Sequence, residues 1–192
     1  MYFSIIILLC CCTQPLFSMS GDSVLQTFNA ERISIQQTGM QVLGSWSLAN
    51  IIIGGINSTQ TRGESSAFWQ MNAGWNIVNA SIAGFGYFTQ SMPTTLSGTI
   101  AEQHSIETLL AVNAGLDLAY IVGGFYLREK AKTSDQETRL RGFGNAIILQ
   151  GAFLLLFDAA LYAANAHHGK QLQSIIQSIS LTSNGIGLNI SF

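Results

Sequence analysis

Apolar residues are concentrated in long runs that polar segments separate. These runs cover residues 40–56, 68–90, 108–127 and 143–164. About 20 apolar residues at about 1.5 Å of helix rise each cross a hydrocarbon core of about 30 Å. The pattern therefore predicts an all-α protein, a four-helix transmembrane bundle. The run 68–90 is the least hydrophobic, because it contains Asn72, Asn76 and Asn79, and its insertion is expected to need its neighbours.

Residues 1–20 have the pattern of a secretory signal peptide. An apolar stretch from Phe3 to Cys12 is followed by polar residues and by small residues at Ser18 and Ser20, which suit cleavage before Gly21. The first residues lack Lys and Arg, so an uncleaved segment that acts as a fifth span is the alternative. The orientation of the later spans is the same in both cases.

The chain has three cysteines, all within this signal segment: Cys10, Cys11 and Cys12. A cleaved chain would therefore contain no disulfide and no zinc-thiolate site. Lipidation of one of these cysteines is a further alternative. It is disfavoured, because Leu8 and Leu9 are large where a small residue is expected.

Residues 169–192 form the predicted C-terminal tail. Leu172, Ile175, Ile176 and Ile179 recur at i, i+3, i+4 and i+7, with Gln and Ser on the other face. This spacing predicts a short amphipathic helix that lies in the headgroup layer on the outer side. The membrane domain proper is then expected over residues 21–168.

Charged residues make up 9% of the chain, whereas soluble domains carry about 25%. A soluble all-helical domain is therefore the disfavoured alternative. The basic residues are also unevenly placed, since five of the eight Lys and Arg lie between the last two apolar runs: Arg128, Lys130, Lys132, Arg139 and Arg141. Basic segments stay on the cytoplasmic side. With Arg62 also inside, we expect a bacterial inner-membrane protein whose mature termini are both periplasmic.

Small residues recur at intervals of four in two of the predicted spans. The third span carries Ala111, Gly115, Ala119 and Gly123, and the second carries Ala80 and Gly84. Such stripes let transmembrane helices approach closely. The sequence thus predicts that both stripes are helix-packing seams.

Two carboxylic acids, Asp117 and Asp158, lie within the predicted spans, without a basic partner in any span. Asp117 is near the midplane, where insertion costs about 2.5–3.5 kcal/mol. Asn50 and Asn79 lie at a similar depth, and Asn113 precedes Asp117 by one turn, so these residues form a candidate polar or ion site. Asp117 is expected to be protonated and hydrogen-bonded, hydrated through a cavity, or neutralised by a bound cation.

The histidines flank the spans on the outer side: His104, His167 and His168. Nothing in their spacing requires a metal or haem site, so we expect surface residues, no cofactor and no metal. No nucleophile motif, phosphate loop or basic nucleic-acid patch is present. A membrane enzyme using Asp158, His104 and His167 is the weakest alternative, so no catalytic residue is assigned.

The segments GMQVLGSWSLAN (residues 39–50) and FWQMNAGWNIVNA (residues 68–80), together with the third and fourth spans, resemble a family of small four-span bacterial membrane proteins known as a domain of unknown function. The resemblance covers residues 22–170. It implies the same topology and brings no activity, cofactor or site. The leading hypothesis is a non-enzymatic structural or partner-binding bundle, whose partners are the lipid bilayer and a second copy or another membrane protein. The alternative is a small proton- or cation-coupled transporter or channel subunit that uses Asp117.

Overall fold

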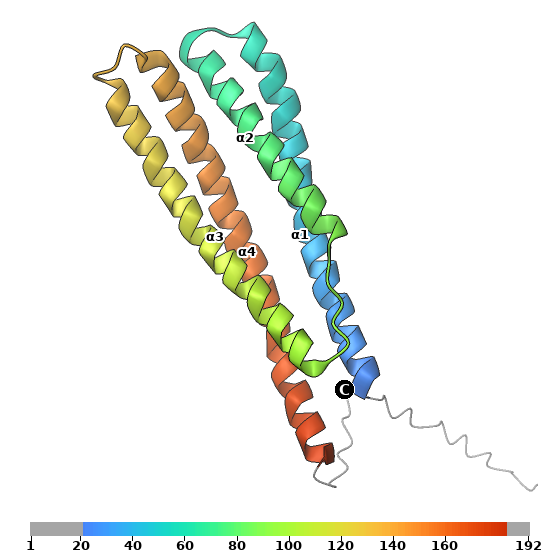
Figure 1. Ribbon diagram of the computed structural model, residues 1–192. Coiled ribbons are helices and arrows are strands. Elements are labelled where there is room, and N and C mark those ends of the chain that lie inside the picture. The colour runs from blue at the N-terminus through green and yellow to red at the C-terminus, as the bar shows by residue number, and fades with distance from the viewer. Residues whose placement is uncertain (1–20, 184–192) are drawn as a thin grey trace, which may run out of the picture.

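The computed structural model describes residues 21–183, and these residues form four helices. They are α1 (Gly21–Gln60), α2 (Gly63–Phe88), α3 (Leu96–Ala131) and α4 (Glu137–Ser183) (Figure 1). The predicted all-α class is therefore confirmed. The predicted signal segment, residues 1–20, and residues 184–192 lie outside the described part of the chain.

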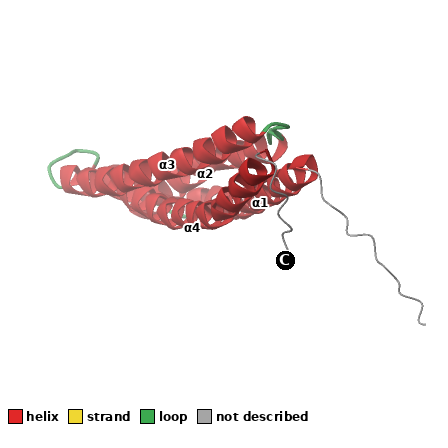
Figure 2. Cartoon of the chain, turned by 90° about the horizontal axis from the view of Figure 1, so that it is seen from below, coloured by secondary structure: helices red, strands yellow, loops and turns green. Residues whose placement is uncertain are grey.

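The helices form two antiparallel hairpins, α1–α2 and α3–α4, whose turns lie at the same end of the bundle (Figure 1). We call this end the loop end and the opposite end the terminal end. The α1–α2 turn is tight because Gly63 adopts a positive φ of 63°, which glycine reaches without strain. Residues 89–95 join the hairpins at the terminal end, and Thr95 caps α3 by accepting a hydrogen bond from the Gly98 amide. Figure 2 shows that short loops at the ends join elements that are all helical.

The helix α4 is the centre of the bundle, because it packs against all three others. From Leu154 onward, its buried residues are spaced alternately by four and three: Leu154, Asp158, Leu161, Asn165, His168 and Leu172. The facing helix α3 buries Leu110, Asp117, Gly124 and Ala131 at intervals of seven. A seven-residue repeat keeps one face directed at a neighbouring helix when the helices supercoil with a left-handed twist.

The predicted small-residue seams are wrong within this chain. A Cβ atom on Gly115, Gly123 or Gly84 would meet nothing within 4 Å. On α3, Ala111 and Ala119 are exposed, and on α2, Ala80 is only half-buried. An interval of four residues turns by about 40° more than one full helical turn at each step, so such a stripe drifts away from a face that follows the seven-residue repeat.

Other glycines lie where the helix backbones approach one another closely. A Cβ on Gly144 of α4 would lie 2.6 Å from the Gly124 carbonyl oxygen of α3, and one on Gly54 of α1 would lie 3.0 Å from the Trp69 carbonyl oxygen of α2. A Cβ on Gly142 of α4 would clash with the Glu64 carbonyl oxygen of α2. Glycine at these three positions lets helix backbones touch in each main interface.

The helices extend well beyond the predicted spans towards the terminal end. The flank of α1 before residue 40 belongs to one continuous helix, and α4 runs on to Ser183. The predicted separate C-terminal helix is thus wrong, because Leu172 continues the buried spacing of α4 and is only 6% exposed. Because α4 packs against α1 beyond residue 164, the helix continues there.

By length and composition, three of the described helices are able to cross a membrane: Asp22–Gln60, Leu96–Ala131 and Glu137–Gln177. The helix α2 is not among them, in line with its expected weakness as a span. Its buried residues include the amides Asn72, Asn76 and Asn79, which lower its apolar character.

Exchanging glycine for leucine at a buried and an exposed position tests the packing. Gly144→Leu should lower the free energy of unfolding by about 1–3 kcal/mol or more, because its side chain meets the α3 backbone. Gly115→Leu should change it by less than about 0.5 kcal/mol, because the site is open. Thermal melting of the purified proteins in detergent measures both. Equal destabilisation by the two changes would show that the face of α3 with Gly115 is also closely packed.

Candidate functional site

The polar residues inside the bundle cluster around α2 and α4. The buried members nearest the middle are Ser47, Asn72, Asn76, Asn79, Asp117, Gln150 and Asp158. No Lys or Arg lies among them. Buried polar groups in an apolar surrounding need internal hydrogen bonds, so their pairing determines what this region does.

Two of these residues, Asn72 and Gln150, close a hydrogen-bonded ring with Trp46 and Asn50 across three helices, which we call the amide ring. The Trp46 indole of α1 donates to Gln150 Oε1 of α4 at 3.2 Å. The Gln150 amide donates to Asn72 Oδ1 of α2 at 2.6 Å, and the Asn72 amide donates to Asn50 Oδ1 of α1 at 2.9 Å. The Asn50 amide returns to the Trp46 carbonyl oxygen at 2.8 Å. Each of the four residues both donates and accepts, Trp46 through its indole and its backbone carbonyl, so the ring fixes the three helices in one register.

The amide ring changes the predicted site. Asn50 was expected beside Asn79 and Asp117, but its amide pairs with Asn72 and Trp46 instead. The sequence missed Gln150 and Asn72 as partners, because their pairing depends on the parallel alignment of α2 and α4. Asn113 is half-exposed and does not join the ring.

The two predicted acids do come together. Asp117 of α3 and Asp158 of α4 are 3% and 6% exposed, and their side chains lie within hydrogen-bonding reach of each other. Two ionised carboxylates repel each other, so this proximity favours a proton or a cation shared between them. If both were ionised, Asp117 Oδ2 would have no partner among the described residues.

Two buried amides of α2 lie at a similar height in the bundle to this carboxyl pair. Asn72 of α2 lies level with Gln150 of α4, and seven residues further on the same parallel register brings Asn79 level with Phe157, the neighbour of Asp158. Asn79 Nδ2 and Asn76 Oδ1 are without hydrogen-bond partners among the described residues. The carboxyl pair and these amides thus form the least satisfied polar region of the described bundle.

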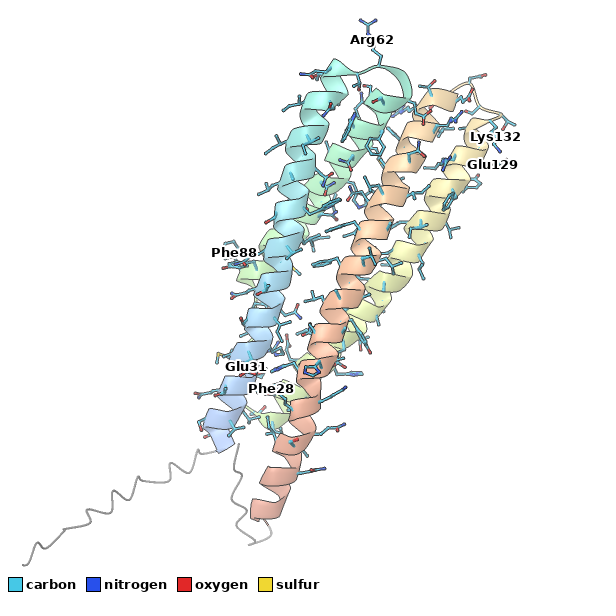
Figure 3. The ribbon with its side chains drawn as sticks, turned by 180° about the vertical axis from the view of Figure 1, so that it is seen from behind. Phe28, Glu31, Arg62, Phe88, Glu129 and Lys132 are labelled. Carbon is cyan, nitrogen blue, oxygen red and sulfur yellow. The ribbon has the colours of Figure 1, made fainter. Side chains whose placement is uncertain are left out.

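A second polar network lies near the terminal end, where Phe28 and Glu31 are seen in Figure 3. Arg32 of α1 is fully buried, donates to the Ser91 carbonyl oxygen at 2.7 Å, and lies 3.6 Å from Glu102 of α3. Asn29 donates to the Pro93 carbonyl oxygen at 3.1 Å. These bonds hold the connection 89–95 against α1, in the place that α2 leaves free when it ends at Phe88.

The same network includes a histidine that was expected on the surface. His168 is 4% exposed, stacks on Phe28 with ring centroids 4.1 Å apart, and lies 3.0 Å from the Phe28 carbonyl oxygen through Nε2. The expectation was wrong because α4 continues beyond residue 164 and meets the first turns of α1. Asn29, Arg32 and Gln36 recur at i, i+3 and i+7, so this spacing was the signal available in the sequence.

Two of the hollows on the described surface are lined by neither Asp117 nor Asp158. One, at the loop end, is lined by Phe125, Arg128, Glu129, Lys132 and Arg141. The other is lined by His104, Glu107, Thr108, Ala111, Val112 and Tyr162. Among the described residues, no three His, Cys, Asp or Glu side chains are grouped so as to hold a metal ion.

The comparison with known families gives one match. The family described as a family of unknown function (DUF6992) matches residues 42–159, more than half of the chain. This range contains the amide ring and the carboxyl pair. No curated protein and no solved structure matches the chain significantly.

Breaking the amide ring should destabilise the bundle. Asn72→Leu leaves Gln150 and Asn50 without their partner, so we expect a loss of about 1–3 kcal/mol in the free energy of unfolding. Asn113→Leu is the matched control, because Asn113 is half-exposed and outside the ring, and it should change little. Melting temperatures that fall equally in both variants would show that the ring contributes no specific stability.

Proposed function

We propose a function for this chain, which belongs to the family of unknown function DUF6992. It is a four-span integral membrane protein with a non-enzymatic, structural or partner-binding role. The observation that carries this proposal is a belt of exposed apolar side chains around all four helices. It is formed by residues 42–56 of α1, 77–88 of α2, 109–126 of α3 and 149–162 of α4. Phe88, 84% exposed, extends outward from α2 in Figure 3.

The belt has the dimensions that a bilayer requires. Along α3 it reaches from Leu109 to Tyr126, about 27 Å of helix, against a hydrocarbon core of about 30 Å. A Cβ on Gly44 of α1 would lie 3.6 Å from the Ala83 Cβ of α2, and Trp46 of α1 donates to Gln150 of α4. These contacts bring the belt segments of α1, α2 and α4 to one level. The short, amide-rich α2 contributes Ile77, Val78, Ile82, Phe85 and Phe88, which supports its crossing as the fourth span.

The distribution of charge supports one orientation. Arg62 and Lys132 lie at the loop end, as Figure 3 shows, and the other basic residues of the α3–α4 hairpin turn are near Lys132 in the sequence. We therefore propose that the loop end is cytoplasmic in a bacterial inner membrane and that the terminal end is periplasmic. The helix extensions beyond the belt, with Arg32 and His168, then project into the periplasm.

A structural or partner-binding role follows from how the interior is filled. In the belt region the amide ring bonds across three helices, and Asp117 and Asp158 are almost fully covered. An enzyme would need an acid, a base and an open pocket within reach of one another. His104 and Tyr162 line an open hollow, but Asp158 does not.

The second candidate function is proton- or cation-coupled transport, and the carboxyl pair favours it. A cation bound at Asp117 and Asp158 would also find a possible ligand in the unpaired amide oxygen of Asn76. Ionisable groups at this depth commonly mark ion pathways. This function requires a water-filled route to the pair in at least one state of the protein.

Cysteine labelling tests the membrane topology. In a background with Cys10, Cys11 and Cys12 replaced by serine, single cysteines at the exposed positions Ser97 and Gln173 should react with a membrane-impermeant maleimide in spheroplasts. A cysteine at the exposed position Thr133 should react only after the membrane is opened. Labelling of position 133 in intact spheroplasts would reverse the proposed orientation. Complete recovery of the protein without detergent would refute its insertion.

Replacing one acid by its amide separates the two functions. In the structural role, Asp117→Asn should change the free energy of unfolding by less than about 0.5 kcal/mol, because its amide donates to the Asp158 carboxyl group without a shared proton. Reconstituted parent and variant should both show no pH- or Na⁺-driven flux. Glu129→Gln, at an exposed ion pair, is the control. Flux in the parent and in the control, lost in Asp117→Asn at equal melting temperature, would establish transport instead.

A further inference from the structure

The hollow beside His104 lies at the periplasmic edge of the belt, where headgroups meet the hydrocarbon core. Its lining changes along α3 from the polar His104 and Glu107 to the apolar Ala111 and Val112, and Tyr162 of α4 completes it. Its volume, about 360 Å³, is within the range of ligand pockets, about 300–1,000 Å³. A site that changes from polar to apolar over two helical turns is suited to an amphiphile.

The apolar end of the hollow continues into an open groove. Ala111 lines the hollow and is also the first residue of the exposed stripe Ala111, Gly115 and Ala119. A Cβ on Gly115 would meet nothing within 4 Å, and Leu116 and Leu118 project on its two sides. The stripe is about 12 Å long, close to the depth of one leaflet's hydrocarbon, about 15 Å.

The polar end of the hollow carries the carboxylate of Glu107. Glu107 accepts a hydrogen bond from the Gln103 amide at 2.7 Å, and Gln103 also donates to the Asn165 carbonyl oxygen. No Lys or Arg lines this hollow. The Glu107 carboxylate, without a basic residue in the lining, favours a cation that donates several hydrogen bonds.

We propose that this site binds one phosphatidylethanolamine molecule of the outer leaflet, with its primary ammonium group at Glu107 and one acyl chain along Ala111, Gly115 and Ala119. The inference rests on the proposed membrane insertion. A primary ammonium carries three N–H donors, whereas the trimethylated ammonium of phosphatidylcholine carries none. The site therefore discriminates between these two lipids by hydrogen bonding at Glu107.

A second copy of the chain fits this face less well. Two copies inserted in the same orientation are related by an axis along the membrane normal, so equivalent residues meet at the same depth. Each Glu107 would then approach its counterpart, without a basic residue in the lining of the hollow. A lipid headgroup instead brings the opposite charge.

Lipid titration observed by native mass spectrometry tests the site. In detergent, the parent should retain phosphatidylethanolamine about tenfold more tightly than phosphatidylcholine of the same acyl chains, and Glu107→Gln should remove this preference. Ala111→Phe, which fills the hollow, should weaken the binding of both lipids. Glu129→Gln and Ala152→Phe are the matched controls at exposed positions and should bind like the parent. Helical circular dichroism and melting establish that each variant is folded.

Two results would overturn the lipid site. One is equal retention of the two lipids by the parent, or an unchanged preference in Glu107→Gln. The other is a parent dimer that Ala111→Phe separates without any change in lipid retention, which would make this face an interface between copies. Both results leave the membrane proposal intact. A protein recovered entirely in the soluble fraction after carbonate extraction would instead refute the insertion on which the inference rests.

Discussion

The burial of uncharged polar side chains inside an apolar bundle is the constraint on which the rest of this structure depends. An amide without a partner in such a surrounding loses more free energy than one hydrogen bond returns, so each buried amide needs a partner from another helix or from its own. The amide ring of Trp46, Gln150, Asn72 and Asn50 meets this need with groups from three helices. It defines the relative height of α1, α2 and α4.

The seven-residue repeat of α4 explains how one helix organises the bundle. The repeat contains polar members, Asp158, Asn165 and His168, as well as Leu154, Leu161 and Leu172, so the face that α4 turns to its neighbours is both apolar and polar. Asn165 accepts from Gln36 of α1 at 2.8 Å, and its carbonyl oxygen accepts from Gln103 of α3. In a proposed membrane protein, where lipid is as apolar as the core, such specific contacts and close glycine approaches replace the hydrophobic effect as the basis of helix association.

The bundle divides into two parts with different interiors. In the belt region the interior carries amides and the carboxyl pair, without a basic residue. Beyond the belt, towards the terminal end, a buried guanidinium is acceptable because Arg32 finds the Ser91 carbonyl oxygen, Asn29 and Glu102 around it. The early end of α2 makes this arrangement necessary, since the connection 89–95 replaces the missing helix. The proposed outer-leaflet lipid site lies at the boundary between the two parts.

Local composition and length were sufficient to predict the helical class, the four apolar runs, the weakness of the second run and the clustering of basic residues in one loop. The sequence also identified Asp117 and Asp158 as the acids of the interior. Three features depended on the tertiary structure. Asp117 and Asp158 face each other, and Asn50 pairs with Asn72. Gly124 and Gly144 form the α3–α4 contact, whereas Gly115 faces outward. The physical reason is rotational. A change of one residue in the packing repeat turns a helix face by about 100°, and only the combined contacts of all four helices specify that angle.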